Sequence, residues 1–192
     1  SSFLLISFSQ TIAQYPPSYT NQMIEKAEKD PLTRVYLAPQ RIVWKSSDSL
    51  IVNSEILLQK GVGQAFFGDR NVCRIINKGN TTSGLLLDFG KEIHGGIQIT
   101  TSQSNRVTRK IRVRFGESVS EAFSNVIGDG TTGKEGGATN HHAMRDFEIT
   151  LPGYGSLEVG NTGFRFVRID LIDTPFVVIK DIRAIATSRD IP

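Results

Sequence analysis

The sequence predicts an all-β fold, an antiparallel jelly-roll-like β-sandwich preceded by a short N-terminal helical or extended segment. From Arg41 onward, short runs of β-branched and aromatic residues are separated by Gly, Asn, Ser and Asp, a pattern typical of many short strands. Several of these runs alternate apolar and polar residues, as half-buried antiparallel strands do, and no helical pattern separates them. About eight strands in roughly 150 residues suit a sandwich of this kind.

The strongest alternation lies in residues 107–115. One side of this run is apolar apart from one arginine and holds Val107, Arg109, Ile111, Val113 and Phe115. The other side holds Thr108, Lys110, Arg112 and Arg114. Such a basic side could be mistaken for a polyanion-binding stripe, but Asp146 and Glu148 lie at alternate positions of another predicted strand. We therefore expect the basic side to be solvated or paired with acidic residues across strands.

Composition and charge argue against several classes of function. The chain has 192 residues, of which 39% are hydrophobic, enough for one packed domain. Its 22 basic and 19 acidic residues leave a formal net charge of +3, and no basic block interleaved with aromatic residues occurs, so we expect no nucleic-acid partner. The single cysteine, Cys73, lies between apolar neighbours, which predicts a buried, inert thiol and excludes an internal disulfide.

The first residues indicate export. An apolar run from Phe3 to Phe8 is too short to cross a bilayer, and small and polar residues follow it up to Ala13. Residues 1–14 therefore resemble the end of a secretory signal, with a short N-terminal strand as the alternative, and we expect a periplasmic or cell-surface protein without a membrane span. Residues 15–40 are expected to form an extension with a short helix ending at Pro31, and residues 41–192 the sandwich.

The stretch from residue 126 to residue 142 comes close to a phosphate-binding signature. Gly128, Gly133 and Lys134 have the spacing of a P-loop, but Glu135 occupies the position of the Ser or Thr that binds Mg²⁺. The stretch also lacks a preceding buried strand, and two further glycines follow where a helix should begin. We therefore expect a long loop and no nucleotide partner.

The same stretch ends in His141 and His142, which raises the question of a metal site. Adjacent side chains on an extended chain point in opposite directions, so at most one of them could join His94 or Asp146 in a given site. The spacings HxH and HExxH are absent, and we predict no metal. Calcium stays open as a cofactor because acidic residues and loop carbonyls offer oxygen ligands, although the EF-hand order is absent.

Hydrolysis of a glycoside would need a pair of carboxylates, and sugar binding favours exposed aromatic rings. Glu92, Glu117 and Glu121 are candidate carboxylates, but the sequence does not show them converging, and salt bridging is their ordinary fate. A GxSxG nucleophile motif is absent. The candidate aromatic platforms, each more simply explained as a core residue, are Trp44, Tyr154 and Phe164.

Four short motifs follow one another between residues 88 and 167. They are Asp88–Gly90 ahead of a Gly-Gly pair, Arg114–Glu117, Arg145–Asp146 and Gly163–Val167. With these motifs, residues 35–192 resemble the N-terminal β-sandwich region of glycoside hydrolase family 78, the bacterial α-L-rhamnosidases. The final ATSRDIP resembles the segment that leads into the catalytic domain of that family.

The resemblance implies a function for the chain and for its surroundings. In that family, an (α/α)6 barrel after the sandwich carries the acidic residues, which work by inversion through an activated water, and these have no counterpart here. We therefore predict no catalytic residue and no hydrolysis by this chain alone. The expected function is that of a non-catalytic sandwich packed on its own C-terminal catalytic domain, with rhamnose-containing glycans as candidate ligands. The alternative is an autonomous carbohydrate-binding module.

The residues singled out fall into two groups. The candidate ligand-binding residues are His94, His141, His142, Arg145 and Asp146. The candidate structural residues are Asp88, Gly90, Gly95, Gly96, Arg114, Glu117, Gly163 and Arg165. We expect the glycines near residues 90–96 to allow a tight turn and close strand approach, and we expect Arg114 with Glu117, and Arg145 with Asp146, to brace strand ends. Arg165 could dock against the catalytic domain.

Overall fold

The computed structural model describes residues 22, 34–59, 64–65, 68, 70–102, 107–124, 145–173 and 175–187. The chain divides into the units Ser1–Thr33 and Arg34–Pro192, and every strand lies in the second unit. The strands are β1 (Val35–Leu37), β2 (Arg41–Lys45), β3 (Ile51–Val52), β4 (Cys73–Ile76), β5 (Gly84–Ser102), β6 (Arg109–Gly116), β7 (Asp146–Leu151), β8 (Tyr154–Leu171) and β9 (Phe176–Ala186). Two short helices, η1 (Ser54–Leu58) and α2 (Val119–Phe123), complete the described elements.

All strand pairs are antiparallel, and the hydrogen-bonded order is β3-β4-β9-β5-β8-β6-β7, with β1 beside β9 and β2 beside β5. The predicted antiparallel β-sandwich is thereby confirmed. The signal-like residues 1–14 and the loop 126–142 lie outside the described residues, and residues 22 and 34–40 are the described part of the predicted extension 15–40. The sheet begins at β1, ahead of Arg41. None of the described helices has the length and apolar composition needed to cross a membrane.

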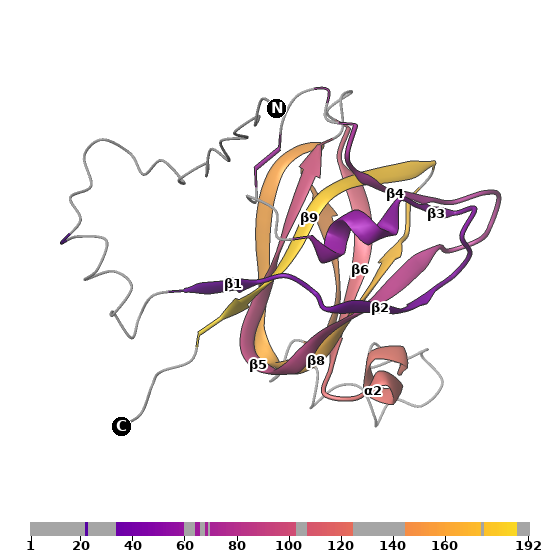
Figure 1. Ribbon diagram of the computed structural model, residues 1–192. Coiled ribbons are helices and arrows are strands. Elements are labelled where there is room, and N and C mark those ends of the chain that lie inside the picture. Colours follow the sequence, from indigo (N-terminus) through magenta and orange to yellow (C-terminus); the bar gives the residue numbers. More distant parts are fainter. Residues whose placement is uncertain are drawn as a thin grey trace, which may run out of the picture. The chain divides into compact units, whose positions relative to one another are not determined.

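Two long strands, β5 and β8, belong to both layers of the sandwich (Figure 1). The first part of β5, residues 84–88, pairs with β2 and with residues 166–170 of β8. Its later part, residues 95–101, pairs with β9, and residues 97–102 pair with residues 154–159 of β8. The β5–β8 register breaks between residues 88 and 93 of β5, where the strands bend. One continuous sheet therefore folds back on itself and encloses a core.

Glycines make this bend possible, as the sequence predicted. Gly90 has φ +80°, a left-handed conformation that side chains rarely adopt, and the side chain of Gln40 packs where its β-carbon would be. At Gly96, a β-carbon would overlap the backbone oxygens of Val159 and Gly160. These positions allow neighbouring strands to approach closely.

The core between the layers is apolar and aromatic. Phe164 packs edge to face against Phe89 and Phe115, with ring centroids 5.8 Å and 4.8 Å apart. Phe164 is fully buried, so the simpler interpretation of this residue as core is confirmed. Cys73 is also buried, and burial raises the pKa of its thiol to about 12, which makes it the inert thiol expected from its neighbours.

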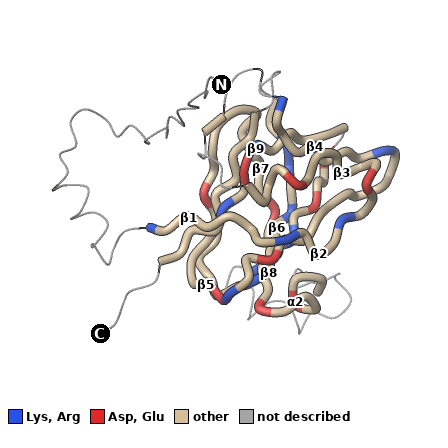
Figure 2. Tube along the Cα trace, viewed as in Figure 1, with Lys and Arg blue, Asp and Glu red and all other residues tan. Residues whose placement is uncertain are grey.

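The basic side of β6 pairs with acidic side chains, as predicted, rather than forming a polyanion-binding stripe. β6 and β7 align Arg112 with Glu148 and Arg114 with Asp146. Arg112 Nη2 lies 2.5 Å from Asp146 Oδ2, and this hydrogen bond, above all, raises the pKa of Arg112. Figure 2 shows basic and acidic residues interspersed over the strands.

Two ion pairs expected from the sequence have other partners in the structure. Arg114 pairs with Asp170 at 2.5 Å rather than with Glu117, because Gly116 ends the strand and Glu117 lies beyond it. Arg145 pairs with Glu117 at 3.0 Å rather than with Asp146. Arg145 and Asp146 are adjacent residues at the start of a strand, so their side chains leave opposite faces.

Candidate binding site

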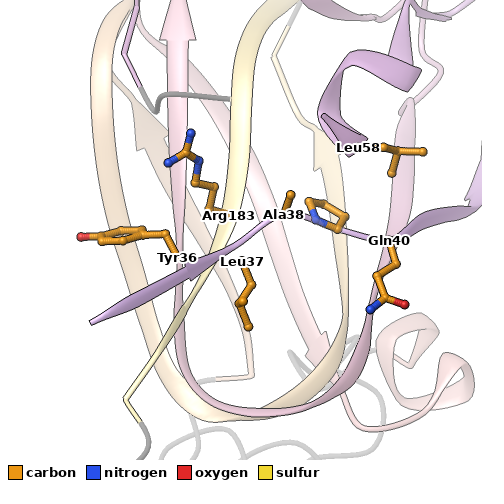
Figure 3. A pocket seen from close by; sticks show the side chains of 7 residues that line it. Tyr36, Leu37, Ala38, Gln40, Leu58 and Arg183 are labelled. Atoms are coloured by element: carbon orange, nitrogen blue, oxygen red, sulfur yellow. The ribbon is translucent and has the colours of Figure 1, made fainter. Parts of the chain in front are cut away.

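Two pockets adjoin β1. The larger, of about 600 Å³, is lined by Tyr36, Leu37, Ala38, Pro39, Gln40, Leu58 and Arg183. The smaller, of about 250 Å³, is lined by Arg34, Gly95, Gly96, Glu158, Val159, Gly160, Asn161, Ile185 and Thr187. Figure 3 shows Tyr36 and Gln40 at opposite ends of the larger pocket, joined by the chain that leads from β1 to β2.

A carboxylate links the two pockets. Glu158 Oε1 accepts hydrogen bonds from the Tyr36 hydroxyl at 3.0 Å and from Gln98 Nε2 at 3.1 Å. Glu158 Oε2 accepts one from Arg34 Nη1 at 2.6 Å. We call Arg34, Tyr36, Gln98 and Glu158 the Glu158 cluster. Tyr36 lines the larger pocket and Arg34 the smaller, so the cluster lies where both pockets meet β1.

Strand alternation directs the cluster away from the core. Gln98 and Glu158 are partners in the β5–β8 register. Their chain neighbours Ile97, Ile99 and Leu157 pack in the core, so Gln98 and Glu158 leave the opposite face of the sheet. Pairing between β5 and β8 therefore brings together two polar side chains that are 60 residues apart in the chain.

The Glu158 cluster can both stack against a ligand and hydrogen-bond to it. The Tyr36 residue is 40% exposed, so part of its ring is open to a ligand. A carboxylate offers about four acceptor positions, and the cluster uses three of those on Glu158. One position stays open for a hydroxyl donor. An aromatic surface beside a few convergent polar groups is the usual composition of a small-molecule site.

Three of the nine residues that line the smaller pocket are glycines, Gly95 and Gly96 from β5 and Gly160 from β8. Glu158 and Asn161 are among its polar lining residues. His94, one of the predicted ligand-binding residues, lies beside this pocket: its Nδ1 is 3.3 Å from Oγ1 of Thr187, a lining residue. Of the five predicted ligand-binding residues, His94 is the one that the structure places here.

The other predicted ligand-binding residues are elsewhere. Arg145 forms ion pairs with Glu117 at 3.0 Å and with Glu121 at 3.4 Å, beside α2. Asp146 is buried and bonded to Arg112. Gly163 lies next to the carboxylate of Glu117. His141 and His142 lie outside the described residues.

Asp88 and Arg165, predicted to be structural, form a second polar centre with Arg41. Asp88 is buried and accepts hydrogen bonds from Arg165, from the Gly90 amide and from Arg41. Hydrogen bonds lower the pKa of Asp88 to about 2, with the largest contribution from Arg165 and smaller ones from the Gly90 amide and from Arg41. Among the described residues, no three of the types His, Cys, Asp and Glu are grouped in a way that could hold a metal.

None of the four residues of the Glu158 cluster belongs to the site residues predicted from the sequence. Gln98 and Glu158 are the polar positions of two alternating runs, which indicates exposure but no partner. Trp44, a predicted platform, instead packs against Phe123, with ring centroids 5.2 Å apart, and under the Arg168 guanidinium at 4.7 Å. Tyr154 is 39% exposed, but its hydroxyl bonds to the backbone oxygen of Ala65 at 2.7 Å.

The fold is an antiparallel β-sandwich in which β5 and β8 continue from one layer to the other. No family model and no curated protein matches the chain. Among solved structures, a truncated AlyQ protein with CBM32 and alginate lyase domains aligns with a TM-score of 0.52 and 10% identity, over 83% of this chain and 35% of that chain. A fucose-binding module of Streptococcus pneumoniae aligns with a TM-score of 0.50 and 10% identity, over 82% of this chain and 97% of that one.

A rhamnosidase from Klebsiella oxytoca, with rhamnose bound, aligns over 84% of this chain and 31% of that chain with 13% identity. The TM-score of this alignment is 0.48. At identities this low, the likeness to the other two structures concerns the fold alone.

Proposed function

We propose that this chain is a non-catalytic, carbohydrate-binding β-sandwich of an exported glycoside hydrolase that resembles the α-L-rhamnosidases of family 78, located in the periplasm or at the cell surface. The Glu158 cluster is the surface that binds the sugar. One observation carries this assignment: an exposed tyrosine ring stands beside a carboxylate that keeps one acceptor position for a ligand. Fold neighbours support it, since the AlyQ structure with its CBM32 domain and the fucose-binding module, aligned with TM-scores of 0.52 and 0.50, are carbohydrate-related by their names.

The sugar would lie with the apolar face of its ring on Tyr36 and a hydroxyl donating to Glu158. Gln98 and Arg34 hold the carboxylate in place from either side, so the site needs little reorganisation on binding. Rhamnose-containing glycans are the ligands that the four motifs of the family 78 resemblance suggest.

A second candidate function is support of a C-terminal catalytic barrel. The motif residues Arg114, Glu117 and Arg145 form ion pairs with other parts of the sandwich and line neither pocket, which favours a framework role for the motifs. In that case a protein extended past Pro192 through the barrel would cleave an aryl α-L-rhamnoside, and this chain alone would not. Cleavage by the 192-residue chain would refute both proposals.

Isothermal titration of the chain with rhamnose-terminated oligosaccharides tests the primary proposal. We expect the Tyr36→Ala and Glu158→Gln variants to weaken binding at least tenfold. Tyr154→Ala is the matched control, because Tyr154 has a similar exposed fraction but lines neither pocket, and its hydroxyl bonds to the backbone oxygen of Ala65. Titrations with calcium and with a chelator decide whether a cation contributes. Absence of binding, or equal loss in the Tyr154 variant, would contradict the assignment of the site.

A further inference from the structure

The side chains of Arg41 and Arg165 form a second surface feature, which we call the arginine pair. Arg41 comes from β2 and Arg165 from β8, and both donate to the same oxygen of Asp88. The distances from Oδ2 are 2.8 Å to Arg41 Nη2 and 3.1 Å to Arg165 Nη2. The two nitrogens are therefore at most about 6 Å apart, a separation that one carboxylate group can bridge with two hydrogen bonds.

The arginine pair has donors that point away from Asp88. Asp88 is 1% exposed, whereas the side chains of Arg41 and Arg165 are 65% and 36% exposed. Each guanidinium uses Nε and Nη2 on Asp88 and has five N–H groups in all. Within the part of the chain that the structure describes, Nη1 of neither arginine has a hydrogen-bond acceptor.

The charge of the arginine pair exceeds that of its counter-ion. Two guanidiniums share the single carboxylate of Asp88, so these three side chains together carry one positive charge, and the Glu92 carboxylate acts electrostatically on Arg165. The pair is also held in place. The Arg165 guanidinium lies 5.0 Å from the centroid of the Phe166 ring, and its hydrogen bonds to Asp88 raise its pKa. Rigid guanidinium forks with free N–H groups bind planar anions such as carboxylates.

The arginine pair lies near one end of the larger pocket, although neither arginine lines it. Gln40, which lines the pocket opposite Tyr36, precedes Arg41 and packs its side chain against Gly90, whose amide bonds to Asp88 (Figure 3). The extended chain from Tyr36 to Arg41 covers about 16 Å. A short oligosaccharide can therefore reach from the Glu158 cluster to the arginine pair.

We propose that the arginine pair binds the carboxylate of a uronic acid residue in a glycan whose neutral sugar lies on the Glu158 cluster. This inference rests on the proposed function for the neutral sugar. Proximity to the pocket favours a glycan. An acidic protein is disfavoured because the exposed Glu92 carboxylate lies close enough to Arg165 to act on it electrostatically, whereas the centre of a protein interface is depleted of charged residues.

Titration with a tetrasaccharide of alternating galacturonic acid and rhamnose tests the proposal, with the same tetrasaccharide reduced at its carboxyl groups as the neutral probe. We expect the acidic form to bind at least tenfold more tightly at low salt. Arg41→Gln and Arg165→Gln should each remove most of this difference and leave the affinity for the reduced form unchanged. Arg74→Gln, an exposed arginine on β4, is the control and should change neither affinity.

Two results would overturn the inference: equal affinity of the wild type for both tetrasaccharides, or wild-type affinity of both arginine variants for the acidic form. Equal binding of a hexaglutamate peptide, with the same dependence on the two arginines, would overturn the assignment to a glycan. Arg41→Gln keeps the test valid if Arg165→Gln does not fold, because Arg165 still holds Asp88 in that variant.

The same titrations separate this inference from the proposed function. Binding of the reduced tetrasaccharide that is lost in Glu158→Gln supports the sugar site, whatever the arginine variants do. Arginine-dependent binding of the acidic form that is unchanged in Glu158→Gln supports the arginine pair and refutes the sugar site.

Discussion

Replacement of Asp88 by asparagine removes one buried negative charge and keeps the shape of the side chain. Asp88 accepts hydrogen bonds from Arg41, Arg165 and the Gly90 amide at the bend where β5 and β8 pass between layers. An asparagine oxygen can satisfy part of this set, but its amide group faces donors. We expect Asp88→Asn to destabilise the sandwich by loosening the bend.

The size of the effect follows from the pKa of Asp88. The structure lowers it from 3.8 to about 2, which corresponds to about 2 kcal/mol favouring the ionised carboxylate in the folded chain. Both arginines are open to solvent, and water screens such pairs, so the loss should lie between about 1 and 2 kcal/mol at pH 7. An exposed ion pair contributes less to stability. Asp48→Asn, which breaks the surface pair of Asp48 with Lys45, should lower the free energy of unfolding by less than about 0.5 kcal/mol.

The direction in which the pKa of Asp88 is shifted determines how the stability of the fold depends on pH. A carboxyl whose folded pKa lies below its unfolded value stabilises the fold above the unfolded pKa, and this stabilisation is lost as pH falls through the folded pKa. The stability difference between wild type and Asp88→Asn should therefore be constant above about pH 5 and fall to roughly half by about pH 3.

Urea unfolding of wild type, Asp88→Asn and Asp48→Asn from pH 7 to pH 3 measures these differences. A loss in Asp88→Asn no greater than that in Asp48→Asn would refute the importance of the Asp88 centre. A stability difference that stays unchanged down to pH 3 would refute its electrostatic origin.

Three further predictions concern the framework. Gly96→Ala should destabilise the chain by more than about 3 kcal/mol or prevent folding, because its β-carbon would overlap backbone oxygens of β8. Thermal unfolding measures this effect. Wild-type stability of the variant would contradict the close approach of β5 to β8 at Gly96. Arg112→Gln should lower the free energy of unfolding by about 3 kcal/mol, because it removes the guanidinium that pairs with the buried Asp146. The control Lys45→Gln, which breaks an exposed pair, should lower it by less than about 0.5 kcal/mol. Equal urea midpoints for the two variants would show that the pair of Arg112 and Asp146 is unimportant. The Cys73 thiol, with its pKa raised to about 12, should resist alkylation at pH 8 until urea unfolds the chain, and rapid native labelling would disprove its burial.

Much of the fold could be predicted from local patterns. Alternation in residues 107–115 identified β6 and its buried side, and the acidic residues of β7 accounted for its basic side. The partners of the ion pairs were harder to predict from the sequence. Arg114 binds Asp170, which is 56 residues away in the chain and becomes its neighbour when β6 pairs with β8. Residues adjacent in sequence, such as Arg145 and Asp146, were poor guides because neighbouring side chains on a strand diverge.

The sequence by itself determined the class of fold, the burial of Cys73 and the places where glycine was needed, since these depend on the period of two along a strand and on single residues. Only the tertiary structure decided which polar side chains meet. Tyr36, Gln98 and Glu158 come from β1, β5 and β8, and Arg41 and Arg165 converge on Asp88 from β2 and β8. Both centres depend on the pairing register of strands far apart in the chain, and no local pattern contains that register.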